Sequence, residues 1–161
     1  MRSEPFQPVV HAVLCRRCPS GYQLCLHRRE ATGFMDGYWV FPGGRIDSGE
    51  KASEAAYREL FEEWGVKATR LTVVAQLSYE TNGAVDPFGA IIERCGSNFV
   101  FLADKWQGVP RAIEPHLHSS PAFFDIHQLP TPVPVWVQDV ANQLGCCSSE
   151  LVKHYREVIE R

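Results

Sequence analysis

Three glutamates with helical spacing are the residues of this chain best suited to do chemistry. Glu59, Glu62 and Glu63 stand at positions i, i+3 and i+4, so on a helix that turns about 100° per residue their side chains share one side. Like charges at these spacings repel one another by roughly 0.2–0.5 kcal/mol per pair. A hard divalent cation such as Mg2+, which prefers oxygen ligands, would offset that repulsion. The triplet therefore predicts a metal site, and the alternative is a solvated acidic face.

A helix from about Ala52 to Trp64 must position this triplet. The stretch contains no Gly or Pro and is rich in helix formers, and Gly65 follows where a helix end favours a left-handed residue. Before it, the sequence 41–44 reads as a turn because it holds Pro and two glycines. A second arc of the helix holds large apolar side chains that we expect to face the core: Tyr57, Leu60, Phe61 and Trp64. Small side chains flank the acidic arc and should leave it accessible: Ala52, Ala55 and Ala56.

The same stretch resembles the Nudix box, G-x5-E-x7-R-E-U-x-E-E-x-G-U, in which U is an aliphatic residue. The match holds at every fixed position: Gly44, Glu50, Arg58, Glu59, Leu60, Glu62, Glu63, Gly65 and Val66. From about Val9 to Leu129 the chain is more loosely similar to Nudix hydrolases of the MutT-like group. The resemblance implies a Nudix-type α/β/α sandwich with a mixed sheet. It also implies a Mg2+-dependent hydrolase, with Mn2+ as a substitute, that cleaves a diphosphate linked to another group.

Further roles follow from the resemblance alone. It assigns Arg58 to hold the loop and the helix acids in place, with Glu50 as its ion-pair partner. Because Arg58 stands one residue before Glu59, we do not expect it to point with the triplet. The resemblance also makes the backbone carbonyl of Gly43 a metal ligand beside the three glutamates, and places Gly44 at the substrate.

Candidates outside the box are less strongly indicated. Glu114 lies between two predicted strands and is either a fourth acid of the site, acting as ligand or base, or an exposed loop residue. Either Arg28 or Arg29 contacts phosphate as a charge-assisted donor, or the pair is a solvated strand end. His116 and His118 lack a third ligand for a transition metal. Aromatic side chains available for base stacking are Phe34, Tyr38, Phe88 and Trp106.

Composition narrows the class of protein. Hydrophobic residues make up 45% of the 161 residues, so we expect one folded domain over residues 1–161. A net charge of −3 without a Lys/Arg run argues against a sequence-independent nucleic-acid binder. No apolar run approaches the roughly 20 residues of a membrane span, and the first residues do not resemble a secretory signal. We therefore expect a cytoplasmic protein, and the sequence allows a homodimer.

The remaining elements predict an α/β protein. Apolar or alternating runs indicate strands at 9–15, 22–27, 38–41, 71–79, 91–92, 98–103 and 122–126. Turn residues predict a loop at 80–90 and a bend at 95–97. Helical periodicity indicates helices at 135–144 and from Ser148 onward.

The substrate is the least determined property. The MutT-like resemblance points to a nucleoside triphosphate, oxidised or unmodified, giving a monophosphate and pyrophosphate. The alternatives are an ADP-ribose or nucleotide-sugar diphosphatase, and a non-catalytic Nudix-like nucleotide-binding module. The intact triplet argues against the last alternative, because binding alone does not require three carboxylates.

Overall fold

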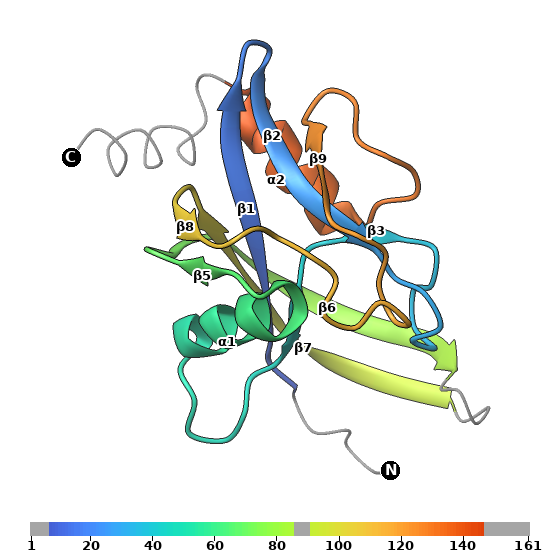
Figure 1. Cartoon of the computed structure of the whole chain (residues 1–161). Coiled ribbons are helices and arrows are strands. Elements are labelled where there is room, and N and C mark those ends of the chain that lie inside the picture. Colours follow the sequence, from blue (N-terminus) through green and yellow to red (C-terminus); the bar gives the residue numbers. More distant parts are fainter. Residues whose placement is uncertain (1–6, 86–90, 147–161) are drawn as a thin grey trace.

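A mixed sheet lies between two helices in the computed structural model, which describes residues 7–85 and 91–146 (Figure 1). The strands and helices, in chain order, are β1 (Val9–Cys18), β2 (Gly21–Arg28), β3 (Trp39–Val40), β4 (Gly43–Arg45), α1 (Ala52–Trp64), β5 (Lys67–Ala68), β6 (Thr72–Val85), β7 (Ile91–Ala103), β8 (Trp106–Gln107), β9 (Ala122–Asp125) and α2 (Val135–Gly145). The predicted α/β/α sandwich with a mixed sheet is confirmed.

Strand β1 is the centre of the sheet. The main path runs β3-β2-β1-β7-β6, while β4 pairs with β1 and β9 pairs with β2. β1 and β7 run parallel, with Val10 opposite Phe99, and the other pairs of this sheet are antiparallel. A separate two-stranded ladder joins β5 and β8. Pairing of β4 with β1 brings Gly43 and Gly44, at the start of the box, against the middle of the sheet.

Alternation along β1 divides the core into two layers. Val13 and Cys15 are fully buried in the layer that includes the apolar side chains of α2. Val10, Ala12 and Leu14 are fully buried in the layer that includes those of α1. This is the pattern of a strand covered on both faces. The sheet is thus a rigid support for residues that α1 presents.

Helix α1 begins and ends where the sequence predicts. Gly65 adopts a left-handed φ of 68° and its N–H donates to the carbonyl of Phe61. The predicted apolar face is only half right, because Tyr57 and Phe61 are 39% and 53% exposed. Ala55 and Ala56 are instead fully buried with Leu60 and Trp64. Small side chains let the helix lie close to the sheet, and this close packing outweighs the larger hydrophobic area of the two aromatic rings.

Strands β6 and β7 extend furthest beyond the predicted runs, and β1 and β2 extend beyond theirs by two or three residues. β6 continues to Val85 and pairs with β7, so the predicted loop at 80–90 is wrong for residues 80–85. The turn residues Asn82 and Gly83 fall where the ladder register shifts between Thr81 and Ala84. The predicted bend at 95–97 is also absent, since these residues pair in register with β6. Cross-strand hydrogen bonds here override local turn preference. Phe88 and the predicted helix from Ser148 lie outside the described residues.

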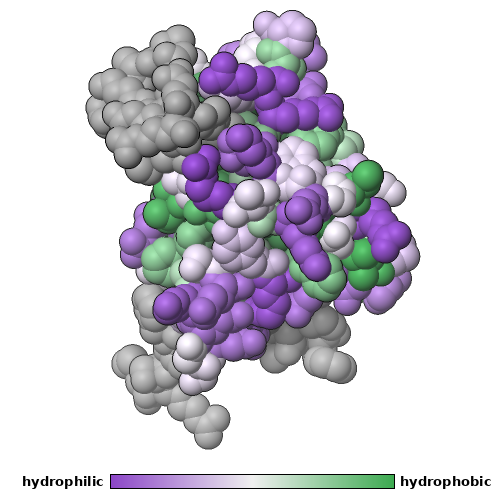
Figure 2. Space-filling model, turned by 60° about the vertical axis from the view of Figure 1, so that its left-hand side comes forward, coloured by the Kyte–Doolittle hydropathy of each residue, from purple (hydrophilic) through white to green (hydrophobic). Residues whose placement is uncertain are grey.

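The surface is mixed in character. On the face drawn in Figure 2, hydrophilic residues form a broad band across the lower part, with apolar residues scattered among them. Within 7–85 and 91–146, neither helix has the length and apolar character that crossing a bilayer would require.

Candidate active site

The three predicted glutamates differ in their exposure. Glu59 and Glu63 have side chains that are 10% and 12% exposed, whereas the side chain of Glu62 is 56% exposed. They share α1, but only Glu59 and Glu63 turn inward toward the sheet. The structure therefore brings two carboxylates into a largely dry environment, with the third at its edge.

Two glycines of β4 make room for these carboxylates. A Cβ on Gly44 would stand 2.7 Å from the carboxyl carbon of Glu59, a distance that no real Cβ tolerates. The N–H of Gly43 donates to Oε2 of Glu63 at 3.3 Å. The requirement for glycine here is thus a close approach between backbone and acid. The predicted substrate contact of Gly44 stays a prediction, since the space beside its Cα is filled by Glu59.

Arg58 links the loop to the acids of the helix. Its guanidinium donates to both oxygens of Glu50, at 2.8 and 3.0 Å, which confirms the predicted ion pair. It also donates to Glu59 at 2.8 Å and to Glu62 at 3.2 Å. The expectation that Arg58 points away from the triplet is therefore wrong, because its long side chain folds back over the helix surface. These hydrogen bonds lower the pKa of Glu50 to about 2 and raise the pKa of Arg58.

Burial makes the two inner acids hard to ionise. Desolvation, followed by the charge of Glu59, raises the pKa of Glu63 to about 8, although Gly43 and Arg29 oppose the shift. Desolvation also raises the pKa of Glu59, against the effect of Arg58. The positive charges of Arg58 and Arg29 therefore do not offset the desolvation of these two carboxylates. Carboxylates that are desolvated and poorly neutralised are suitable ligands for a divalent cation such as Mg2+. Glu59 and Glu63 would hold this cation, with Glu62 and the Gly43 carbonyl as the other predicted ligands.

The structure separates the two candidate arginines. Arg29 is half-buried, donates to the carbonyl of Phe34 at 2.7 Å, and lies near enough to Glu63 for the two charges to interact. Arg28 is exposed and forms an ion pair with Glu30 at 2.7 Å. Adjacent residues of an extended chain point to opposite faces, so Arg29 lies on the face toward Glu63 and Arg28 on the other.

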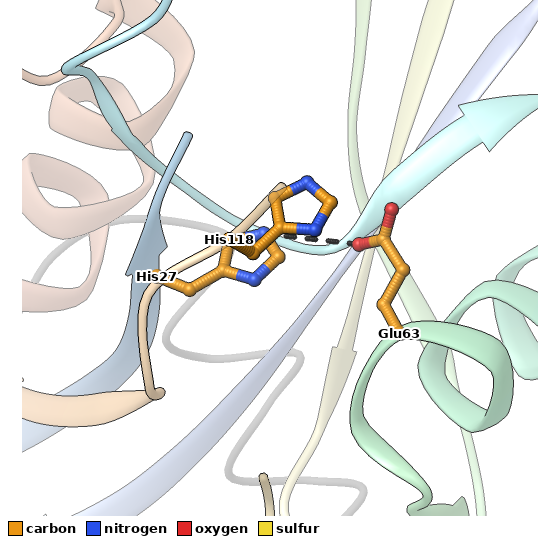
Figure 3. A group of neighbouring side chains, drawn as sticks. All are labelled: His27, Glu63 and His118. Atoms are coloured by element: carbon orange, nitrogen blue, oxygen red, sulfur yellow. Dashed lines mark ion pairs between the residues drawn. The ribbon is translucent and has the colours of Figure 1, made fainter. Parts of the chain in front are cut away.

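His27 is a buried residue of the site that sequence analysis missed. Its side chain is 1% exposed, its Nδ1 accepts the indole N–H of Trp64 at 3.0 Å, and its Nε2 lies 3.7 Å from Oε2 of Glu63. The ring stacks on His118 with centroids 4.2 Å apart, and Glu63 reaches toward the pair from α1 (Figure 3). Burial first, then the neighbouring charges, lowers the pKa of His27 to about 2, so the imidazole is neutral despite its closeness to Glu63.

Glu114 is exposed, but its loop is docked on the site. The N–H of Ile113 donates to the backbone carbonyl of Glu63 at 3.1 Å, and the N–H of His118 donates to the carbonyl of Glu114 at 3.1 Å. The charge of Glu114 contributes to the raised pKa of Glu63. The loop thus reaches the C-terminal end of α1 beside Glu63, while the role of the Glu114 carboxylate stays a prediction.

The aromatic candidates have different surroundings. Trp106 stacks on Phe123 with centroids 5.9 Å apart and packs against the core beneath α1, so it is a packing residue. Phe34 is 40% exposed and its ring lies 5.8 Å from the Arg29 guanidinium carbon. Tyr38 is half-buried in the loop before β3.

His11 and Asn98 form a polar pair on the α2 side of Gly43, which the sequence analysis did not identify. His11 Nδ1 is 2.7 Å from Asn98 Oδ1, and its ring lies 5.4 Å from that of Trp136. A Cβ on Gly43 would stand 2.5 Å from the His11 ring. Burial lowers the pKa of His11 to about 4. Aromatic and polar groups therefore lie directly beside the backbone of the glycine loop.

Comparison with known proteins identifies the family. The NUDIX domain model matches residues 5–143. An oxidized purine nucleoside triphosphate hydrolase of Danio rerio is 29% identical over 108 residues, which cover 67% of this chain and 62% of that protein. An RNA pyrophosphohydrolase of Shewanella piezotolerans is 37% identical over 73 residues, which cover 45% of this chain and 38% of that protein. The chain thus spans between about two-fifths and three-fifths of the length of these curated relatives.

The same conclusion follows from a solved structure. The crystal structure of a MutT NUDIX hydrolase from Burkholderia pseudomallei superimposes with a TM-score of 0.69 at 26% identity, covering 87% of this chain and 98% of that one. The family model spans most of the chain, and the box residues run from Gly44 in β4 through α1 to Val66 just after it. The chain belongs to the NUDIX domain family, in its MutT-like group.

Proposed function

We propose that the protein is a Mg2+-dependent diphosphohydrolase, with Mn2+ as a substitute, that converts a nucleoside triphosphate, oxidised or unmodified, to a monophosphate and pyrophosphate. The observation that carries the proposal is the pair of buried acids, Glu59 and Glu63, packed against the glycine loop. Two carboxylates with raised pKa values in one dry site are costly for a structural role alone. They suit a site in which cations and a polyphosphate replace water.

Each residue of the site has a distinct task in this proposal. Glu59 and Glu63 hold the cation, which when bound neutralises phosphate charge and acidifies a water molecule. Arg58 fixes Glu59 in place through its clamp on Glu50. Arg29 donates to a phosphate oxygen, since its guanidinium is half-buried near Glu63 and is held by Phe34. The base stacks beside His11 and Trp136, where polar and aromatic groups meet.

The choice of a nucleoside triphosphate is supported by the name of the Danio rerio relative. Another relative is named as an RNA pyrophosphohydrolase, so triphosphorylated RNA ends are a competing substrate. That relative matches less than half of this chain. Two further alternatives remain to be tested: hydrolysis of ADP-ribose or a nucleotide sugar, and a non-catalytic binding role.

The net charge of −3 favours small nucleotides over nucleic acid as substrates. We propose a cytoplasmic location. A homodimer is compatible with the proposal.

A substrate panel with Mg2+ tests this function. Nucleoside triphosphates, their oxidised forms, ADP-ribose, nucleotide sugars and 5′-triphosphorylated RNA would be incubated with the protein, and products separated by anion-exchange chromatography. We expect pyrophosphate from the triphosphates and loss of activity in Glu63→Gln. Asp104→Asn is the matched control. It also neutralises one acid, but this acid pairs with Arg70 and is not a residue of the candidate site. Turnover of no compound in the panel would refute the enzymatic proposal.

A further inference from the structure

The tautomer of His27 follows from a single contact. An indole N–H can only donate, so Nδ1 of His27, which lies 3.0 Å from Trp64 Nε1, is an acceptor without a proton. In a neutral imidazole the proton is then on Nε2. This Nε2–H is buried and has no hydrogen-bond partner within the described part of the chain. Oε2 of Glu63, an acceptor, lies 3.7 Å from it.

His27, His118 and Glu63 offer three ligand atoms within 4.8 Å of one another, but their geometry argues against a transition-metal site. The two rings are stacked only 6° from parallel. An ion in the plane of one ring would therefore lie well out of the plane of the other, away from its nitrogen lone pair. Moreover, Nε2 of His27 carries the proton and has no lone pair to offer. The cluster requires another explanation.

The two donors nearest to the Glu63 carboxylate in the contacts described above both face its Oε2. Gly43 donates its N–H to Oε2, and His27 points its Nε2–H at the same oxygen. No hydrogen bond to Oε1 occurs among the residues that the structure describes. Two donors on Oε2 would leave Oε1 available to a bound cation.

We propose that His27 is a positioning residue for Glu63. By donating its Nε2–H to Oε2, it fixes the orientation in which the carboxylate presents Oε1 to a bound cation. A separation of 3.7 Å is longer than a hydrogen bond, so a small shift of the carboxylate completes the contact. Trp64 sets the tautomer, and His118 stacks on the ring and limits its rotation. The inference rests on the proposed function, because it assumes that Glu63 holds a cation.

Two variants of His27 separate positioning from packing. The carboxamide nitrogen of His27→Gln reaches about as far as Nε2 and can still donate to Glu63. In His27→Asn the shorter side chain ends near Nδ1, so it retains an acceptor for Trp64 but loses the donor to Glu63. Both variants lose the stacked ring, which makes each the control for the other.

Mn2+ alone is the first probe, with free ion followed by electron paramagnetic resonance. We expect His27→Asn to weaken Mn2+ affinity about tenfold, the lower end of the effect of partners that orient metal ligands, and His27→Gln to stay within about threefold of wild type. With Mg2+ and a nucleoside triphosphate, His27→Asn should lower kcat by about 10- to 100-fold while KM changes by less than about threefold. Equal losses in both variants, or none in either, would overturn the proposal. If wild type binds Mn2+ but hydrolyses no nucleotide, the proposed function fails while the Mn2+ comparison still decides the role of His27.

A measurement on the unmodified protein covers the case in which a variant does not fold. Long-range 1H–15N spectra report the tautomer of each histidine. We expect His27 to carry its proton on Nε2, and this proton to shift downfield when Mg2+ is added. A proton on Nδ1, or an Nε2–H signal that Mg2+ leaves unchanged, would refute the assignment.

Discussion

Raising the pH from 6.5 to 8 in the presence of a chelator should destabilise the metal-free protein. Burial raises the pKa of Glu63 to about 8 in the folded state, from 4.5 for an unperturbed glutamate. Between these two values the folded protein retains a proton that the unfolded chain has released. Stability therefore falls as the pH rises through this interval, because the folded state binds more protons.

The histidines oppose this effect in the lower part of the window. Their pKa values are lowered from 6.5 to about 2 for His27 and about 4 for His11, and the pKa of His118 is lowered as well. For these groups the unfolded state binds more protons, so they increase stability as the pH rises. Half of each unfolded imidazole is still protonated at pH 6.5, so each histidine adds about 0.4 kcal/mol between pH 6.5 and 8. Burial also raises the pKa of Cys25 to about 12 from 9.0, which matters only at higher pH. Glu59 is raised in the same direction as Glu63 and can only add to the fall.

The magnitude follows from the width of the window. One pKa unit corresponds to about 1.36 kcal/mol, so 1.5 pH units give an upper limit of about 2 kcal/mol for one group. Glu63 titrates toward the end of this interval and its side chain is 12% exposed, so we expect wild type to lose about 1–2 kcal/mol relative to Glu63→Gln, which retains the histidines. Excess Mg2+ should reverse the loss, since it binds the ionised carboxylate of the folded state.

Urea denaturation at pH 6.5, 7.0, 7.5 and 8.0 measures the effect, first with chelator and then with excess Mg2+. Glu63→Gln has no proton to lose at this position and should not show the fall, while Asp104→Asn should follow wild type. The reasoning is refuted if the stability of wild type relative to Glu63→Gln in chelator is constant or rises across this range. An equally steep fall in Glu63→Gln would assign the effect to another group.

Three further substitutions test single contacts. Gly44→Ala should lower Mn2+ affinity and kcat by about 10- to 100-fold, because a methyl group would occupy the space of the Glu59 carboxylate; affinity equal to wild type would contradict this. Glu114→Gln should lower kcat by roughly ten- to a thousand-fold with little change in KM if this residue is a ligand or base, and activity within about twofold of wild type would make it an exposed loop acid. Arg29→Ala should raise KM for a nucleoside triphosphate by about tenfold or more, the scale of one charge-assisted hydrogen bond, whereas Arg28→Ala is expected to match wild type; the reverse order would exchange their roles.

Local preference determined the features that sequence analysis predicted well. The bounds of α1 follow from helix formers between a glycine-rich turn and Gly65, and all of these signals lie within the helix or close to its ends along the chain. The Glu50–Arg58 pair was predicted from the resemblance to the Nudix box. Such features do not depend on the rest of the fold.

Features set by packing at a distance were predicted poorly. The buried face of α1 is lined by Ala55 and Ala56 rather than by Phe61, because the separation between helix and sheet decides which side chains fit. The long ladder of β6 and β7 passes through turn residues at 82–83, because pairing with a partner strand outweighs their local preference. Neither result can be read from hydrophobicity along one segment.

One packing contact would have been enough to place His27 and Arg29 in the site from the sequence. Residues 25, 27 and 29 alternate along β2 and its continuation, so they share one face, and Arg28 must take the other. Cys25 is buried in the layer beneath α1, and Trp64 of that helix donates to His27. Once this face of β2 is known to meet α1, the same alternation places His27 and Arg29 near Glu63 and leaves Arg28 exposed. In the proposed function one strand thus supplies a donor for the carboxylate and a cation for the phosphate. The acids come from the facing helix, and the site exists because the packing of β2 against α1 brings the two sets together.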